Sequence, residues 1–177
     1  MALETLRIIH RPEDFEARLV PGHREGDLIK GAVNGTVVER KTRLVILGKM
    51  TGRTASAALP GFTHQMKRVP VALRRRVTCD RNSEMACHSE LARRLKIDIR
   101  FCDPPAHRPR GSNENTNGLL RQVFPKGTDL SDLSQATLND VARMMNDRPR
   151  ETLGWTTHAE AMAQELAAIK STGALQT

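Results

Sequence analysis

The order of hydrophobic segments predicts an α/β protein built on one mixed sheet. Three short runs rich in Val, Ile and Leu follow one another near the start, and two later runs alternate with stretches of helical length. Successive strands followed by alternating strands and helices are typical of a sheet that is only partly parallel. The 177 residues suffice for one domain with a real core, because chains of this size bury roughly 70% of their unfolded surface.

Five strands are predicted from the apolar runs and their turn signals. They should span residues 25–30, 36–39, 43–50, 77–79 and 97–102. The pair Asn34-Gly35 predicts a turn between the first two strands. In the last strand, apolar residues alternate with polar or basic ones, which favours a half-buried strand.

Five helices are predicted between and after these strands. Thr54, Ser83 and Ser112 can cap the first three, because their hydroxyl oxygens can accept a bond from the first turn. Pro60 and Gly61 should interrupt the first helix. The predicted helices span residues 55–67, 84–95, 112–123, 133–146 and 157–169.

The composition indicates a basic protein with reduced thiols. Lys and Arg total 28 against 20 acids, for a net charge of +8 and a pI near 10.1, which suits a polyanionic partner but also an ordinary solvated surface. The three cysteines form no CxxC pair, and no signal peptide or membrane helix is apparent, so we expect a cytoplasmic protein without a membrane partner.

Three acids stand where a carboxylate is unexpected. Asp27 lies within a predicted strand, Asp80 follows the apolar run before it, and Glu114 lies near the start of a predicted helix. Each also has an ordinary explanation: Asp27 on a solvated strand face, Asp80 capping a turn, and Glu114 stabilised by the helix dipole. Acids on two strands and one helix can instead converge and hold two hard cations for displacement at phosphorus.

The sequence words around these acids resemble a known family. GHREGDLIKG, VVERKTR, TCDRNSEMACHSELA and RGSNENTNGLLRQVFPKGTDLS are similar to words in the DDE transposases of insertion-sequence family thirty, the IS-thirty family. The resemblance extends from about residue 11 to about residue 166. It implies a ribonuclease-H-like integrase core: a mixed five-stranded sheet with flanking helices, spanning residues 22–170, with a lead-in arm at 1–21 and a tail at 171–177.

The resemblance also implies a site. Asp27, Asp80 and Glu114 match the catalytic acids, which would bind two Mg²⁺ ions, with Mn²⁺ as a substitute. Helical spacing places Glu114, Asn117, Gly118 and Arg121 on one polar stripe, with Leu119, Leu120 and Val123 directed to the core. The candidate DNA contacts are Arg40, Lys41, Arg110, Asn113, Asn117, Arg121 and Lys126.

Several positions depart from the family pattern. Arg24 and Arg108 stand where the family has Trp, Cys79 where an aromatic precedes the second acid, Asn82 where it has Gly, and His158 where it has Pro. Replacing a packed Trp by Arg should cost roughly 3–5 kcal/mol in packing. Only 21 residues precede the GHREGD word, so the family's helix-turn-helix region is expected to be absent and end recognition with it.

These observations leave three hypotheses. The first is the catalytic core of a transposase that cleaves and joins DNA at transposon ends and target sites, in the bacterial cytoplasm on the nucleoid. The second is a degraded, catalytically inert fragment that binds DNA or pairs with intact transposase as a dominant-negative partner, beside any homo-oligomer. The third is a plain ribonuclease-H-like nuclease. Because its supporting residues have changed, we expect cleavage weaker than that of an intact relative.

Overall fold

The computed structural model describes residues 18–28, 34–50, 55–79, 88–101, 111–125, 128–130 and 132–174. At a few of these positions it describes the backbone alone: residues 27, 28, 34, 55–58, 101, 111–114 and 174. The predicted lead-in arm and tail lie mostly outside the described residues, so the predicted domain boundaries stay predictions.

Five strands form one mixed sheet in the spatial order β3-β2-β1-β4-β5. The first three strands pair antiparallel, while β4 runs parallel to β1 and β5 parallel to β4. This arrangement confirms the predicted fold class, a ribonuclease-H-like core with a five-stranded mixed sheet. The strands are β1 (His23–Leu28), β2 (Asn34–Glu39), β3 (Val45–Lys49), β4 (Arg76–Cys79) and β5 (Asp98–Phe101).

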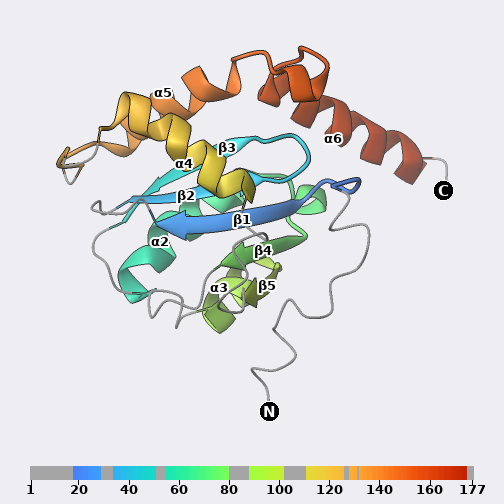
Figure 1. Ribbon diagram of the computed structural model, residues 1–177. Coiled ribbons are helices and arrows are strands. Elements are labelled where there is room, and N and C mark those ends of the chain that lie inside the picture. The colour runs from blue at the N-terminus through green and yellow to red at the C-terminus, as the bar shows by residue number, and fades with distance from the viewer. Residues whose placement is uncertain are drawn as a thin grey trace.

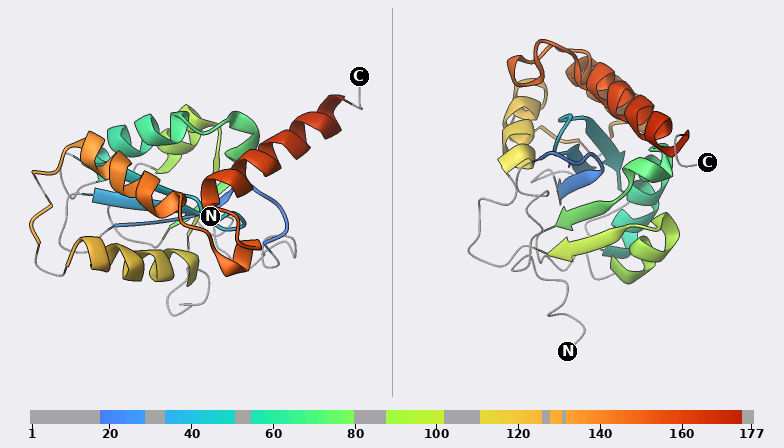
Figure 2. Two further views of the ribbon diagram at one scale, coloured as in Figure 1. Left: turned by 90° about the horizontal axis from the view of Figure 1, so that it is seen from above. Right: turned by 90° about the vertical axis from the view of Figure 1, so that its right-hand side faces the viewer.

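Helices cover both faces of the sheet, as Figures 1 and 2 show. One face carries α2 (Ala55–Lys67) and α3 (His88–Leu95), and the other carries α4 (Gly111–Val123) and α5 (Gln135–Asn146). The last helix, α6 (His158–Ala174), follows the short turn η4 (Glu151–Leu153) and extends toward η1 (Val71–Leu73). None of the described helices is both long and apolar enough to cross a bilayer.

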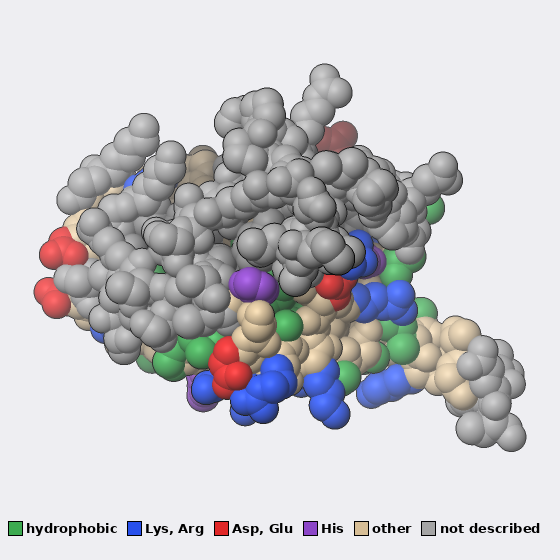
Figure 3. Space-filling view, turned by 90° about the horizontal axis from the view of Figure 1, so that it is seen from below, with side chains coloured by type: hydrophobic (Ala, Val, Ile, Leu, Met, Phe, Trp, Pro, Cys, Tyr) green, Lys and Arg blue, Asp and Glu red, His purple; other side chains and the backbone are tan. Residues whose placement is uncertain are grey.

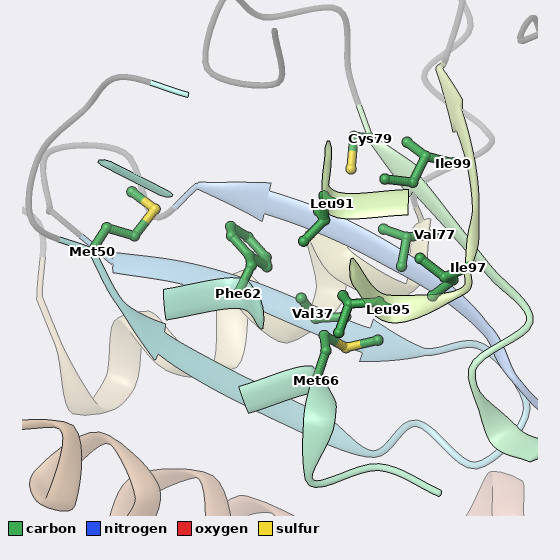
Figure 4. Packing of buried hydrophobic residues seen from close by; sticks show 10 residues of the cluster. All are labelled: Val37, Met50, Phe62, Met66, Val77, Cys79, Leu91, Leu95, Ile97 and Ile99. Atoms are coloured by element: carbon green, nitrogen blue, oxygen red, sulfur yellow. The ribbon is translucent and has the colours of Figure 1, made fainter. Parts of the chain in front are cut away.

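A cluster of buried apolar side chains lies between the sheet and the helices α2 and α3. Phe62 and Met66 of α2 and Leu91 and Leu95 of α3 are at most 7% exposed and pack on strand residues such as Val77 (Figure 4). Each fully buried side chain of this size contributes about 1.5–3 kcal/mol relative to an exposed one. This cluster therefore fixes the two helices on the sheet.

The opposite face has its own cluster, which holds α4 and α5. Val45 and Leu47 of β3 pack with Leu120 of α4 and with Leu138 and Met145 of α5, and all are at most 3% exposed. Ile46, which lies between Val45 and Leu47, packs against the cluster on the opposite face, because successive strand side chains point to opposite faces.

Helix α5 also protects the outer edge of β3, the first strand of the sheet. The Asn146 amide accepts from Val45 N at 2.8 Å and donates to Val45 O at 2.9 Å. The Gln135 amide accepts from Lys49 N at 2.8 Å and donates to Leu47 O at 2.9 Å. Two side-chain amides therefore replace part of a neighbouring strand, and the edge backbone is not left open for further pairing.

Two local predictions were wrong, and packing explains both. Asn34-Gly35 lies inside β2 rather than in a turn. Glycine is needed at position 35 for packing, because a Cβ there would stand 2.7 Å from Phe62 Cζ. Helix α2 continues through Pro60 and Gly61, and a Cβ at Gly61 would overlap the Lys49 carbonyl oxygen. In both places glycine allows a close approach between α2 and the sheet rather than a turn.

Candidate active site

The parallel pairing of β1 and β4 brings together the residues that precede the first two candidate acids in the chain. Glu25 of β1 is paired with Thr78 of β4 in a parallel register. A Cβ at Gly26 would lie 3.2 Å from the Sγ of Cys79, the last residue of β4. Asp27 follows Gly26 in β1, and Asp80 follows Cys79 in the chain but lies outside the described residues. The positions immediately before both acids are therefore neighbours.

Two buried hydroxyls lie beside this strand edge without a bond. Thr36 is the antiparallel partner of Asp27 in β2, and Thr78 is the partner of Glu25 in β4. Both residues are 0% exposed, and neither Oγ1 has a hydrogen-bond partner among the residues that the structure describes. A buried hydroxyl without a partner is costly, so both oxygens are placed to bond to a water or a ligand.

Helix α4 carries the third candidate acid over the same strands. Its first turn contains Glu114, and the helix lies against β1 and β2 (Figure 1). Leu120 is 1% exposed in the core, and Leu119 and Val123 pack against that cluster. The predicted division of α4 into a packing side and a polar stripe is confirmed for these leucines and this valine.

The three acids themselves stay a prediction. Asp80 is outside the described residues, and only the backbone is described at Asp27 and Glu114. Among the side chains that the structure describes, no three His, Cys, Asp or Glu residues come together as metal ligands. Strand β1, which carries Asp27, pairs with β4 and contacts α4, the helix that carries Glu114.

The sequence is similar to those of bacterial transposases over most of its length. It is 49% identical over 161 residues to the transposase for insertion sequence element IS1086 of Cupriavidus metallidurans, and 38% identical over 163 residues to transposase InsI for IS30A of Escherichia coli. The transposase for IS4351 of Bacteroides fragilis is 36% identical over 162 residues. These matches cover 89%, 90% and 89% of this chain and 48%, 43% and 49% of the relatives.

The chain belongs to the IS30 family of transposases. It spans about half the length of the relatives it matches, at 48%, 43% and 49%. No protein-family model matches it. The resemblance found in the acid-containing words is thus confirmed across the chain.

The IS30-like turn after β2 holds two of the predicted DNA contacts, and both are engaged within the protein. Arg40 is 4% exposed, and its Nη1 donates to Glu25 Oε1 at 2.6 Å. Lys41 Nζ lies 2.5 Å from Glu165 Oε1 of α6. Burial removes Arg40 from the surface, so this structure does not support its predicted contact with DNA.

The remaining predicted contacts cluster around α4. Asn117 and Arg121 are half-buried on this helix. The backbone of Asn113 is in its first turn, and Arg110 and Lys126 lie outside the described residues. Three of the predicted contacts, Asn113, Asn117 and Arg121, therefore lie on the helix that carries Glu114.

A buried carboxylate at the opposite end of β2 from Thr36 was not predicted. Glu39 is 0% exposed and accepts three bonds, from Gly22 N at 2.9 Å, Thr42 N at 2.6 Å and Thr42 Oγ1 at 2.7 Å. Its oxygens tie the start of β1 to the turn after β2. No sequence signal distinguishes it from a surface acid, because β1 and β2 lie inside the sheet and are covered on both faces.

Arg24, which stands where the resemblance predicts a Trp, is enclosed by the protein. It is 0% exposed and donates from Nη1 to the carbonyl oxygens of Leu73 and Gly22, while its Nε and Nη2 have no partner in the described part of the chain. Burial, and secondarily the charge of Arg74, lowers the Arg24 pKa to about 10, although Glu39 opposes this shift. The guanidinium therefore stays charged at neutral pH in a site suited to an apolar ring.

Proposed function

We propose that this chain is the catalytic core of a transposase, which cleaves DNA at the end of a mobile element and joins that end to target DNA. The main support is its 49% identity to the transposase for IS1086. The parallel pairing of β1 with β4 and the contact of β1 with α4 add to it, because this arrangement suits convergence of Asp27, Asp80 and Glu114.

The proposed site would hold two Mg²⁺ ions, for which Mn²⁺ would substitute. Asp27, Asp80 and Glu114 supply the carboxylate oxygens that such hard cations prefer. The partnerless hydroxyls of Thr36 and Thr78 fit a hydrated metal centre, since buried polar groups of this kind commonly bond to ordered water. When bound, the metal pair supplies activation of an attacking oxygen and stabilisation of the leaving oxygen.

The other residues of the proposed site would orient DNA rather than react with it. Asn117 and Arg121 lie on the helix of Glu114, where an amide and a guanidinium can bond to phosphate oxygens. Lys and Arg side chains also gather along one edge of the face shown in Figure 3. With a net charge of +8, we expect DNA binding that weakens steeply with salt and shows little preference for transposon ends over random DNA.

Cleavage and joining of labelled DNA test this function. The purified chain should nick DNA with Mg²⁺ or Mn²⁺ and join the product to a second duplex, and Asp27→Asn should abolish both reactions. Asp140→Asn makes the same change at a carboxylate that is 67% exposed on α5, and activity should persist. Nicking without joining would indicate a plain nuclease, and robust nicking by Asp27→Asn would overturn the assigned role.

A catalytically inert DNA-binding or dominant-negative fragment is the second candidate, and Arg24 favours it. A charged side chain with two unbonded nitrogens lies three residues before Asp27, where a poorly packed support would loosen the acid. We therefore expect nicking well below that of an intact relative. Arg24→Trp should raise both the melting temperature and the rate of nicking. Robust nicking by the unmodified chain would exclude the hypothesis of a degraded, inert fragment.

The proposed partners are DNA and other transposase subunits in the bacterial cytoplasm, on the nucleoid. An inert fragment would act by assembling with an intact family member. Co-purification with a full-length relative, and a fall in that relative's strand joining as this chain is added, would test this. Unchanged joining at a large excess of the chain would exclude the dominant-negative role.

A further inference from the structure

A small cavity with several polar side chains in its lining lies beside α4, next to the first turn of that helix. Its volume is about 280 Å³, and it is enclosed by the start of β3, the first half of α4 and the loop that leads into α6. Its polar lining comes from Arg43, Asn115, Thr116, Arg150, Glu151 and His158. Asn115 and Thr116 directly follow Glu114 in α4, so the cavity adjoins the proposed active site.

The lining of this cavity is positively charged overall. His158 Nδ1 donates to Arg43 O at 2.5 Å, and His158 Nε2 accepts from Arg150 Nε at 3.1 Å, which is the bonding of a neutral imidazole. Arg43 and Arg150 then oppose the single carboxylate of Glu151. Within the described part of the chain, Arg150 takes part in no ion pair and its bonded guanidinium atom is Nε. Its remaining donors can therefore hold an anion.

The loop beside the cavity presents the single tryptophan of the sequence to solvent. Trp155 is 70% exposed, and its backbone is in the left-handed region at a φ of 65°. The loop is closed by bonds from Arg150 N to Thr156 O at 3.1 Å, from Trp155 N to Arg150 O at 2.9 Å and from Gly154 N to Glu151 O at 2.9 Å. This strained and well-bonded loop, in which the Trp155 N–H bonds to the Arg150 carbonyl oxygen, holds the indole outside the core, where it buries little of its own surface.

We propose that this cavity and Trp155 form a subsite for a DNA strand with unstacked bases. Arg43 and Arg150 bind a phosphate in the cavity, and the Trp155 indole stacks on the adjoining base. A cationic pocket beside an exposed aromatic ring is the combination that binds single-stranded nucleic acid, and stacking of this kind does not depend on base identity. The subsite rests on the proposed DNA function and would guide a strand along α4 toward Glu114.

Trp155 also reports on this binding, because it is the one tryptophan in the chain. Titration with an oligonucleotide that has unpaired bases should quench its fluorescence and shield it from acrylamide. An oligonucleotide with abasic sites keeps the phosphates and removes the stacking partner, so it should leave the emission nearly unchanged. Binding itself is measured separately, by the anisotropy of a dye on the DNA.

Substitutions separate the two parts of the subsite. Trp155→Ala should weaken binding of the unpaired oligonucleotide about 5- to 100-fold, while Trp155→Phe keeps a stacking ring and should stay within about threefold. The abasic oligonucleotide should not distinguish Trp155→Ala from the unmodified protein. Arg150→Gln should weaken both oligonucleotides and lower the salt slope by about one. Arg93→Ala, which removes a cation that is 73% exposed on α3, is the matched control and should bind like the unmodified protein.

The outcomes distinguish failure of this subsite from failure of the proposed DNA-binding function. If anisotropy shows binding while Trp155 emission stays constant and Trp155→Ala keeps full affinity, the subsite is wrong and DNA binding stands. If neither oligonucleotide binds at low salt, the proposed DNA function fails as well. Circular dichroism of each variant shows whether a loss of affinity reflects unfolding.

Discussion

Adjacent residues of β1 show two ways in which this protein buries charge. Glu25 is matched by Arg40 at 2.6 Å on one side of the strand. Arg24, one residue earlier, belongs to the alternate set of positions and reaches only carbonyl oxygens. Glu39 stands opposite Arg24 in β2, but both of its oxygens are occupied by Gly22 and Thr42. Burial is thus equally deep for both charges, and the difference between them is the availability of a bonded counter-charge.

The largest expected effect on stability comes from breaking the buried ion pair between Glu25 and Arg40. Glu25→Gln keeps the shape of the side chain but leaves the Arg40 charge buried without its carboxylate. We expect the free energy of unfolding to fall by about 3–5 kcal/mol, measured by denaturant titration. The double variant Glu25→Gln/Arg40→Met should recover most of this loss, and a loss below about 1 kcal/mol in the single variant would contradict the assigned pairing.

Removing the buried Arg24 charge, which has no bonded carboxylate, should raise the free energy of unfolding rather than lower it. Arg24→Met keeps the length of the side chain and eliminates a buried cation with two unbonded nitrogens. We expect a gain of about 1–3 kcal/mol in the free energy of unfolding, since an unsatisfied buried polar group costs that much. Arg94→Met, at a guanidinium that is 44% exposed on α3, is the control and should change stability little. Destabilisation by Arg24→Met would show that its two carbonyl bonds outweigh its burial.

The next test concerns backbone groups rather than charges: the side-chain amides of α5 that bond to the edge strand β3. Asn146→Ala leaves the N–H and C=O of Val45 without their side-chain partner at the sheet edge. We expect a loss of about 1–2 kcal/mol, because two bonds of ordinary strength are removed from a half-buried edge. Asn139→Ala, on the same helix, bonds to Gln135 rather than to the strand and should cost less. Equal losses in both variants would argue against edge protection.

The smallest effect concerns His158, which stands where the resemblance predicts a Pro. Burial and the charge of Arg150 lower its pKa below the ordinary 6.5, although its bond to Arg43 O opposes this shift. The unfolded chain therefore takes up this proton first as the pH falls, so the stabilisation is complete above pH 6.5 and is lost below it. The difference in melting temperature between the unmodified protein and His158→Gln should shrink between about pH 6.5 and pH 5. A constant difference across that interval would show that His158 does not titrate on unfolding.

Much of the fold follows from local pattern. The strands at β3 and β4 and the helices α4 and α5 lie within two residues of their predicted bounds, because apolar spacing and capping residues act over a few neighbours. The candidate acids came from irregular sequence words rather than from spacing, and the relatives confirm the family that those words indicated. The cavity beside α4 was not foreseen, because its lining comes from segments as distant as Arg43 and His158.

Local sequence was therefore sufficient for the type and order of the elements, the basic character of the chain and its family. Tertiary packing alone decided which polar residues are buried and what they meet. Arg40 is a residue type that often contacts DNA, but it is buried in an ion pair with Glu25. Gly35 and Gly61 look like turn residues in the sequence, but in the structure they allow α2 to pack closely on the sheet. The physical reason is that a charge or a glycine takes its role from atoms brought near it by the fold, and in a strand covered on both faces the alternation that marks inside and outside is lost.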